Sequence, residues 1–598
     1  IQVLTVGVPE NGDVVVQVLQ SDFESKENTL LAPLPRIIRQ KIGYDYAYEP
    51  NEAVYRSNQY SPESLVRVSE PFYFRSQKVA KIFVQPLQYN PAQQRIRQFT
   101  KIVLQLQFAG DASQQTNVLQ MNKDESVYKN VVLNYEQARP WRSVAQRPSL
   151  RKTTENFFQG DNWFKIKITG DGAGGKEGMY KITGATLREA LSKQNIPLSS
   201  IDPSTIQIYN NGGRELSFDE SAKNDTLIEN PILVIGESDG AFDDSDYILF
   251  YGRSLEGVEF DAVRNRLKHY INPYGYDNIY WLTFNRAPGK RIRQAPSQST
   301  AGISAQPHFK DLAWIEEEKY NIFKSGITWL GHEIRRDNNA YSVTFDLPNA
   351  VPQEDVQVRT AVASLTSGQH YFSVYVNGNS VGQFDQYGGS SSYSLTERVF
   401  TANGVLMDGD NTVTINYNVD TDLAFSYIDF IELEYYRNFS VVSDQLLFFS
   451  PLVTDVIRYN IDGFSNDDVR VFDVTEIGDI REITNFNASN GTIDFADQTT
   501  IIQPKRYMAL SSNAYKSVEA ASISHERVTG MRKSTDVDYI IITYDDFRQQ
   551  AEQLESLREN WSPKERLETE VVAISDVINE FGWGLEDPAA IRNFLAYA

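Results

Sequence analysis

The hydrophobic pattern of this 598-residue chain changes near residue 531. Upstream, short segments of alternating apolar and polar residues, separated by turn residues, predict β-hairpins. Residues 539–542 instead form a continuous apolar run, as in a strand covered on both faces, and a helical pattern follows at once. A second strand is expected at 569–575, after which Asp587 and Pro588 suit the N-cap and first position of a further helix. This order predicts the start of a doubly wound α/β parallel sheet, a fold that binds ligands beyond the carboxyl ends of its strands.

The first helix of this region is predicted to begin at Thr543, which suits an N-cap with Asp546 three residues later. Its apolar face is expected to comprise Phe547, Ala551 and Leu554. Two strands and two helices in about 65 residues would leave one sheet edge and much of one face uncovered. We therefore expect the domain to be incomplete here and the natural protein to continue beyond residue 598.

Length and composition predict a multidomain, mainly β protein. A chain of 598 residues suits roughly three to six domains. Turn signals and composition divide it into a small β domain (1–110), a polar linker (111–158), a β-rich domain with a short helix (159–300), a jelly-roll-like β-sandwich (301–440), a small β module (441–530) and the α/β region (531–598). No run of about 18 apolar residues predicts a membrane-spanning segment. The first residues lack the pattern of a signal peptide, so either there was none or the chain begins after its removal.

Cysteine content and charge exclude several functions. The chain has no cysteine, so it can form no disulfide, thiolate metal site or cysteine nucleophile of its own. Its net charge of −22 argues against nonspecific binding of nucleic acid, because phosphates would be repelled.

Three hairpins and a helix are predicted in the first half. In the first domain, two strands within 79–108 are joined at Tyr89, Asn90 and Pro91, with Ile102, Leu104, Leu106 and Phe108 on one face of the second strand. In the second domain, 163–169 and 178–183 are expected to pair with each other. Residues 204–218 are expected to form a hairpin that turns at Asn211 and Gly212, and 186–196 a short helix.

Two segments of the second domain suggest ligand sites but favour structural interpretations. Residues 170–176 satisfy G-x-x-x-x-G-K, yet Glu177 stands where Ser or Thr should hold magnesium, and a strand follows instead of a helix, which favours a flexible loop. Four carboxylates, Asp239, Asp243, Asp244 and Asp246, lie close together as in a calcium loop. They lack EF-hand spacing, and Asp and Gly also make turns for local reasons, so a structural turn is favoured while calcium binding stays open.

Closely spaced strands in 301–440 predict a β-sandwich, in which Asn377 and Gly378 supply a type I′ hairpin turn. Its outline resembles jelly-roll modules that often bind carbohydrate. Such sandwiches also serve as spacers, and no aromatic platform for a sugar can be identified from the sequence.

Both ends of the chain resemble the gingipain family of cysteine peptidases. The strand 538–543 (DYIIIT), the pattern V-x-x-x-x-x-V-x-N-E-F at 571–581 and the helix pattern D-x-x-A-I-R-N-F at 587–594 are similar to the opening of its peptidase domain. Residues 82–108 are similar to the pro-region of the family. The phrases at 164–172, 178–187 and 238–252 resemble the members that act as sortases of the type IX secretion system.

This resemblance implies the function of the full-length protein. It would sit on the extracellular face of a bacterial outer membrane, remove the C-terminal signal domain of secreted cargo and join the cargo to anionic lipopolysaccharide. A cysteine thiolate and a histidine would perform the chemistry through an acyl-enzyme. The partners implied are an attachment complex with PorV, PorQ and PorZ; no cofactor is expected.

One departure limits what this chain can do. The catalytic His and Cys of the family follow the last helix present here, and the five histidines, His269, His308, His332, His370 and His525, precede the α/β region. Each is interpreted as a solvated or packed structural residue. No catalytic, cofactor-binding or metal-binding residue is therefore assigned, and the chain alone would be inactive. No G-x-S-x-G elbow supports a serine hydrolase, and no acidic pair stands out as a glycosidase site.

The leading interpretation is the N-terminal, noncatalytic part of such a sortase. The alternative is a noncatalytic extracellular protein whose sandwich binds a glycan or a protein. A third possibility is a pro-region scaffold that masks the peptidase cleft until assembly.

Overall fold

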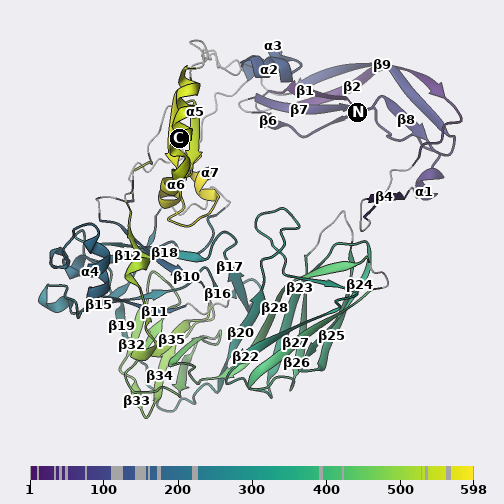
Figure 1. The fold of residues 1–598 in the computed structure, drawn as a ribbon. Coiled ribbons are helices and arrows are strands. Elements are labelled where there is room, and N and C mark those ends of the chain that lie inside the picture. Colours follow the sequence, from purple (N-terminus) through teal and green to yellow (C-terminus); the bar gives the residue numbers. More distant parts are fainter. Residues whose placement is uncertain are drawn as a thin grey trace. The chain divides into compact units, whose positions relative to one another are not determined.

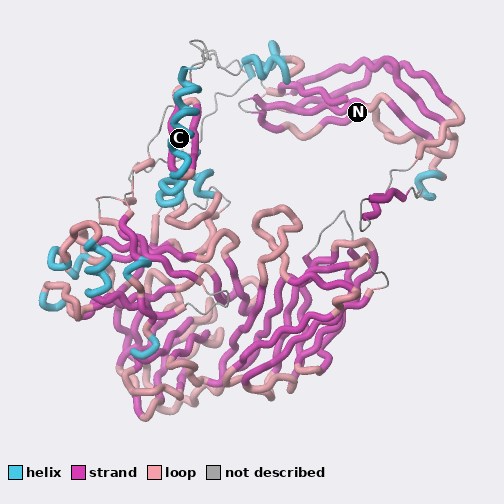
Figure 2. The backbone as a smooth tube through the Cα atoms, in the orientation of Figure 1, coloured by secondary structure: helices cyan, strands magenta, loops and turns pink. Residues whose placement is uncertain are grey.

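The computed structural model describes residues 2–9, 12–32, 36–39, 44–47, 52–74, 77–109, 125–141, 157–158, 160, 162–170, 177–217, 226–388, 395–419, 423–526, 528, 530–532, 537–560 and 567–596. They belong to two compact units, Ile1–Lys152 and Thr153–Ala598. Strands dominate both units, as the mainly β prediction requires (Figure 2). Within the ranges given, no helix has both the length and the apolar character needed to cross a membrane.

The first unit is built on antiparallel sheets (Figure 1). One sheet has the order β1-β7-β5 with β6 also on β7, a second has the order β2-β9-β8, and β3 pairs with β4. The elements are β1 Gln2–Gly7, β2 Asp13–Lys26, β3 Arg36–Arg39, β4 Tyr44–Ala47, α1 Glu52–Tyr55, β5 Val66–Val68, β6 Phe72–Phe74, β7 Gln77–Val84, β8 Leu87–Asn90 and β9 Arg95–Ala109. The predicted hairpin is confirmed, since β8 pairs with β9 and Asn90 lies opposite Arg95. The predicted apolar face of β9 is confirmed too, because all four of its residues pack against the core of this unit.

Part of the predicted linker is folded. Within 111–158, helices α2 (Glu125–Val131) and α3 (Tyr135–Ala138) and the 3₁₀ turn η1 (Arg139–Trp141) are formed. Tyr128, Val132 and Ala138 pack against Val79 of β7. A Cβ on Gly7 would lie 2.2 Å from the Cβ of Ala138, so glycine allows this close approach. The polar composition of the segment concealed these few apolar side chains at helical spacing.

The second unit begins with two facing sheets that share one core. Their orders are β13-β12-β18-β10-β37 and β14-β15-β11-β36, and β16 and β17 form a separate pair. The elements are β10 Phe164–Thr169, β11 Gly178–Thr183, α4 Gly184–Ser192, η2 Leu198–Ser200, η3 Pro203–Thr205, β12 Gln207–Asn210, β13 Ile228–Asn230, β14 Ile232–Ile235, η5 Glu237–Asp239, β15 Tyr247–Gly252, β16 Glu256–Asp261, β17 Arg266–Ile271, β18 Asp277–Thr283, β36 Lys516–Ser517, η7 Ala520–Ser522 and β37 Ile523–His525.

The predicted pairing of 163–169 with 178–183 is wrong. β10 pairs with β18 and β37, whereas β11 pairs with β15 and β36, in the other sheet. Both strands turn their alternate apolar residues into the same core from opposite sides. Alternation fixes which face of a strand is buried but not which strand lies beside it.

The hairpin predicted at 204–218 is also wrong. β12 pairs with β13 and β18, and 211–217 contains no strand. The Oδ1 atoms of Asn210 and Asn211 accept hydrogen bonds from the backbone N–H groups of Gly212 and Gly213, at 2.6 and 2.8 Å. These local turns direct the chain away from the sheet. The predicted helix is confirmed as α4, where the N-cap Thr183 accepts a hydrogen bond from Thr186 N.

The predicted sandwich is confirmed. Its sheets have the orders β20-β28-β23-β26, with β21 also on β28, and β22-β27-β24-β25. The strands are β20 His308–Glu316, β21 His332–Arg335, β22 Ala340–Leu347, β23 Asp355–Ser364, β24 Gly368–Val376, β25 Asn379–Gly388, β26 Leu395–Asn403, β27 Gly409–Asn418 and β28 Phe425–Asn438. Asn377 and Gly378 join β24 to β25 with φ angles of 49° and 79°, as a type I′ turn requires.

The small β module that follows has sheets of order β19-β32-β31-β35-β29 and β30-β34-β33. The elements are β19 Arg293–Pro296, β29 Gln445–Phe449, β30 Val456–Ile461, β31 Val469–Asp473, β32 Arg481–Thr484, β33 Asn487–Ser489, β34 Thr492–Gln498, β35 Arg506–Ser511 and η6 Ser512–Ala514. β19 comes from the chain before the sandwich, while β36 and β37 return to the first two sheets. The sandwich is thus inserted between segments that pack together.

The α/β region begins with a strand, a helix and a parallel strand, as predicted, but the second strand ends at Ala573 and an unpredicted helix follows it directly. β38 (Tyr539–Thr543) and β39 (Thr569–Ala573) form a parallel pair. They are accompanied by η8 (Asp545–Phe547), α5 (Arg548–Asn560), α6 (Ile574–Phe581) and α7 (Ala589–Leu595). Their core includes Val572, Val577, Phe581, Ala590 and Phe594.

Three local predictions for this region are wrong. Thr543 does not cap a helix, because its hydroxyl donates to Tyr544 O and a 3₁₀ turn precedes α5. Phe547 is 62% exposed rather than part of a buried face. Moreover, β38 is half-buried along its length and not covered on both faces by the described residues, which provide one neighbouring strand, β39.

Candidate functional site

A hollow of about 730 Å³ lies where β38 and β39 reach their carboxyl ends. Tyr544 follows β38 directly, and Ile574 and Ser575 follow β39; all three line the hollow. The floor is the outer face of the first sheet of this unit, where Lys165, Lys167 and Thr169 alternate with the core residues of β10. Open α/β sheets bind their ligands at this edge, so the hollow is the candidate functional site.

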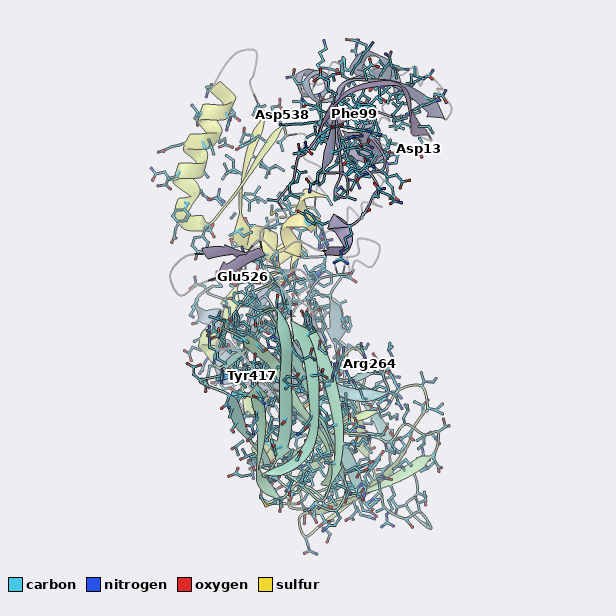
Figure 3. All side chains as sticks on the ribbon, turned by 90° about the vertical axis from the view of Figure 1, so that its right-hand side faces the viewer. Asp13, Phe99, Arg264, Tyr417, Glu526 and Asp538 are labelled. Carbon is cyan, nitrogen blue, oxygen red and sulfur yellow. The ribbon has the colours of Figure 1, made fainter. Side chains whose placement is uncertain are left out.

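A polar network ties α6 to the floor of the hollow. Lys165 Nζ donates to Asn579 Oδ1 (2.6 Å), and Asn579 Nδ2 donates to Glu526 Oε2 (3.1 Å). Glu526, labelled in Figure 3, also forms an ion pair with Lys165 at 3.6 Å. Burial lowers the pKa of Lys165, and the charge of Glu526 offsets part of that effect. The position of α6 is therefore fixed by side chains of the upstream sheet.

The next two residues of the N-E-F pattern anchor the segment before β38. Glu580 is buried and accepts a hydrogen bond from Met531 N at 2.7 Å. Its backbone carbonyl accepts a hydrogen bond from Arg532 (2.9 Å), whose guanidinium lies over the rings of Phe581 and Trp583. The pattern thus has a structural explanation: Asn579 binds the upstream sheet, and Glu580 and Phe581 contact the segment before β38.

Trp583 locks the end of α6 onto the upstream sheet. Its backbone has φ +57°, an unusual value for a bulky residue, and its carbonyl accepts a hydrogen bond from Trp281 Nε1 at 2.8 Å. The ring is buried with Phe157, Phe158 and Trp281 in an aromatic cluster. A Cβ on Gly584 would lie 2.8 Å from Ile279, so the backbone runs directly on the sheet. Local strain is held here by packing.

Asp587 makes the hydrogen bond expected of a cap, although α7 begins at Ala589 with Pro588 at its N-cap position, one residue later than predicted. Asp587 Oδ1 accepts a hydrogen bond from Ala589 N at 2.8 Å, and Pro588 lies between the two residues. The second oxygen accepts a hydrogen bond from Leu216 N at 2.7 Å. Burial raises the pKa of Asp587, and the two backbone donors oppose that shift. One carboxylate therefore caps α7 and binds the upstream chain.

The two suggested ligand segments lie elsewhere. Of the glycine-rich loop, 171–176 lie outside the described residues, and Glu177 is buried, paired with Arg506 at 2.8 Å and bonded to Tyr251. In the acidic loop, Asp246 accepts a hydrogen bond from Asp243 N (2.6 Å) and Asp244 pairs with Arg188 (2.6 Å). These contacts support the interpretation as a turn. Among the described residues, no three His, Asp or Glu side chains are placed to hold a metal ion.

Four of the five histidines pack against aromatic rings. His308 is near Tyr436, His332 stacks on Tyr341, His370 is buried beside Tyr417, and His525 lies edge-on to Phe164. All four lie in β-strands, namely β20, β21, β24 and β37. They are not brought together with one another or with the hollow.

His269 lies in a buried ionic network between β17 and the sandwich. Its Nδ1 is 2.7 Å from Glu432 Oε1, and its Nε2 contacts Glu316. Both ring nitrogens face carboxylates, so both must donate and the imidazole carries a positive charge. Arg359, fully buried, donates to Glu432 (2.6 Å) and to the carbonyl of Leu267 (2.6 Å). The network, defined by His269, Arg359, Glu316, Glu432 and Glu434, joins the β16–β17 hairpin to the sandwich.

The charges of this network shift one another's pKa. Burial lowers the pKa of His269, but the hydrogen bonds and charges of Glu316 and Glu432 outweigh burial and raise it to about 9. Burial raises the pKa of Glu432, but His269 and Arg359 bring it down to about 2. Beside the network, burial and the nearby Glu316 raise the pKa of Glu318 to about 8 and that of Asp429 to about 7. Glu318, which is hydrogen-bonded to Glu316 of the network, also lines the hollow. The network and the hollow are therefore adjacent.

These shifts predict that the second unit loses stability in mild alkali. The contribution of His269 is full below its ordinary pKa near 6.5 and is lost as pH rises through about 9. The raised pKa values of Glu318 and Asp429 act in the same direction at lower pH, because their cost builds up from the ordinary carboxyl pKa and is complete near pH 8 and pH 7. We expect the melting temperature of this unit, measured by calorimetry, to decrease as the pH is raised from 6.5 to 9.5. The His269→Gln variant should start lower and show a flatter dependence; equal slopes would contradict the assignment.

Comparison with known proteins places the two ends of the chain in one family. Residues 1–140 match the family model Propeptide_C25, and 532–598 match the model of peptidase family C25. Gingipain R2 of Porphyromonas gingivalis is 31% identical over 144 residues, which are 23% of this chain and 19% of that protein. Gingipain R1 of the same species is 28% identical over 144 residues, 23% of this chain and 14% of that protein. The two ends of the chain are therefore similar to the propeptide and to part of the peptidase domain of the gingipain family.

The fold of the chain also resembles that of PorU. The crystal structure of dimeric latent PorU from Porphyromonas gingivalis matches 74% of this chain and 40% of that chain, with a TM-score of 0.59 and 17% identity. The match shows a shared fold that extends well beyond the two family regions. The chain spans about a fifth of the length of Gingipain R2 and two fifths of PorU. The resemblance stated from the sequence is thus confirmed.

The sequence analysis missed the residues that build the hollow. Lys165 and Lys167 alternate with the apolar residues of 163–169. This alternation indicates that one face of the strand is polar, but it does not indicate which part of the chain covers that face. Asn579 was part of the quoted family pattern, but its partners are more than 50 residues away. Tyr274 and Tyr276 come from a loop with no motif. Among the residues that line the hollow, Asn579 and Asp587 belong to the family patterns quoted for the α/β region.

Proposed function

We propose that this protein is the upstream, noncatalytic part of a PorU-like sortase of the type IX secretion system. The observation that carries the proposal is the fold shared with PorU over 74% of the chain, together with C25 family matches at both ends. The proposed activity of the whole protein is cleavage of the C-terminal signal domain of secreted cargo and attachment of the new carboxyl end to anionic lipopolysaccharide. The proposed location is the extracellular face of the outer membrane, in an attachment complex with PorV, PorQ and PorZ.

The proposed chemistry uses a cysteine and a histidine that this chain does not contain. A thiolate attacks the carbonyl before the signal domain, backbone N–H groups hold the oxyanion, and the histidine gives a proton to the departing amine. The thioester that results is attacked by an amine of the acceptor, which releases the thiolate and forms an amide. In this proposal, β38 and β39 contribute the first strands of the catalytic sheet, and the upstream modules hold them in place.

Deletion of the gene in the source bacterium tests this function. We expect cargo proteins to keep their C-terminal signal domains and to leave the cell surface, which mass spectrometry of outer-membrane and culture-medium fractions would detect. A plasmid copy of the complete gene should restore cleavage and attachment. Normal processing of all cargo in the deletion strain would refute the proposal.

A further inference from the structure

Most of the hollow beside β38 and β39 is formed by the upstream modules. Of its 24 lining residues, 15 precede residue 531. Twelve of these come from β10, β18, the loop between β17 and β18, and the sandwich, and the other three are Leu255 before β16, Ile271 at the end of β17 and Glu526 after β37. The α/β region supplies the remaining nine. A site built on the α/β region would therefore have walls that belong to the noncatalytic part of the chain.

Exposed aromatic side chains line this hollow from both sides of the module boundary. Tyr276, in the loop before β18, is 73% exposed, and Tyr544, directly after β38, is 60% exposed. Trp329, which is half-buried in a loop of the sandwich, also lines it. Large aromatic rings bury much area on contact and lose little conformational entropy, which is why they are common in interfaces with polypeptide.

The walls are held in fixed positions before any ligand binds. The Tyr276 carbonyl accepts a hydrogen bond from Gly170 N at 2.9 Å, which closes the end of β10 onto the loop. Thr169 Oγ1 donates to Asp277 Oδ1 at 2.6 Å beside it. On the opposite wall, Asn579 is held by Lys165 and Glu526 as described. A preformed wall lowers the entropy that binding costs.

We propose that Tyr276 and Trp329 are specificity-determining residues that contact an extended polypeptide substrate beside the scissile bond. This inference rests on the proposed function. A peptidase sheet presents the scissile bond at the carboxyl ends of its strands, so the chain on one side of that bond must cross the adjoining space. That space is the hollow, whose size suits a stretch of extended polypeptide. The upstream β modules thus select the substrate, while the α/β region cleaves it.

Binding of a labelled peptide to the 598-residue chain tests the inference. The probe is a fluorescein-labelled 20-residue peptide that spans the junction between the mature part and the signal domain of a cargo protein from the source bacterium. Fluorescence anisotropy should show saturable binding, weakened about 5- to 10-fold by Tyr276→Ala or Trp329→Ala, as for a residue at the centre of an interface. Tyr276→Phe should bind within about twofold of the unsubstituted chain, because it keeps the ring.

Tyr387→Ala is the matched control, because Tyr387 lies on β25 of the sandwich, is 74% exposed and does not line the hollow. It should leave the dissociation constant unchanged. Absence of saturable binding, or equal binding by Tyr276→Ala and Tyr387→Ala, would overturn the inference. The gene-deletion experiment fails independently: normal cargo processing would refute the sortase function whatever the binding data show.

Discussion

Replacement of Arg359 by leucine should lower the free energy of unfolding of the second unit by about 3–5 kcal/mol. Arg359 is fully buried and donates to Glu432 and to the carbonyl of Leu267. Its loss would leave Glu432 buried with His269 as its remaining charged partner, while Glu434 would keep its ion pair with Lys310 at 3.0 Å. Breaking a buried ionic network from one side costs much more than the pair contributes, because an unpaired charge stays desolvated.

Differential scanning calorimetry and urea unfolding of the 598-residue chain would measure this loss in the transition that includes the sandwich. Arg264 on the neighbouring hairpin, labelled in Figure 3, is the matched control. Its side chain is 62% exposed and pairs with Asp261, so Arg264→Leu should cost less than about 1 kcal/mol. Equal effects of the two substitutions would show that the network does not hold the junction.

This network could not be predicted from the sequence, although its strands could. Alternation along β28 correctly places Ile431 and Leu433 in the sandwich core and Glu432 and Glu434 on the outer face. From the sequence alone, charged residues on the outer face of a sheet would be expected to be exposed to solvent. Here the β16–β17 hairpin covers them, and its Leu267 precedes Glu432 by more than 160 residues. Whether a face is covered is a property of the tertiary arrangement, which local periodicity does not encode.

Strand pairing was likewise predictable only where the local sequence determines the neighbouring strand. The hairpin at Asn377 and Gly378 was predictable because two residues with positive φ dictate the turn and the partner strand follows immediately. For 163–169 and 178–183, a loop of eight residues leaves the partner open, and the strands joined different sheets. The parallel pair β38–β39 was predictable because the change from alternating to continuous apolar residues, followed by helices, has few other solutions.

The candidate site was predictable in position but not in composition. A parallel strand pair places a site at its carboxyl end, and the hollow is there. Its walls come from Lys165, Tyr276 and Trp329, which carry no motif and lie more than 200 residues upstream. Asn579 and Glu580 belong to a family pattern that suggested importance, yet their contacts are structural: one binds the upstream sheet and the other the segment before β38.

Replacement of Trp583 by alanine should weaken the attachment of α6 and α7 to the upstream sheet. The ring is buried in the aromatic cluster with Phe157, Phe158 and Trp281, and removal of a buried tryptophan costs about 3–5 kcal/mol. Alanine would also retain the unfavourable φ of +57° without the packing that holds it. Since hydrogen bonds from Lys165 to Asn579 and from Leu216 to Asp587 would still hold α6 and α7, the effect should be local and concentrate at 574–596.

Hydrogen exchange measured by mass spectrometry on the 598-residue chain would resolve that local effect. In Trp583→Ala, peptides from α6 and α7 should exchange much faster, while those from the sandwich should not change. Phe547→Ala removes a ring that is 62% exposed in the same region, so it should alter exchange little and cost less than about 0.5 kcal/mol. Faster exchange throughout the second unit would instead mean that the aromatic cluster stabilises the whole unit and not the attachment of the α/β region. Unchanged exchange at 574–596 would mean that the hydrogen bonds of Lys165, Asn579 and Asp587 are enough to hold this region. The walls of the hollow would then stay in place without the tryptophan ring.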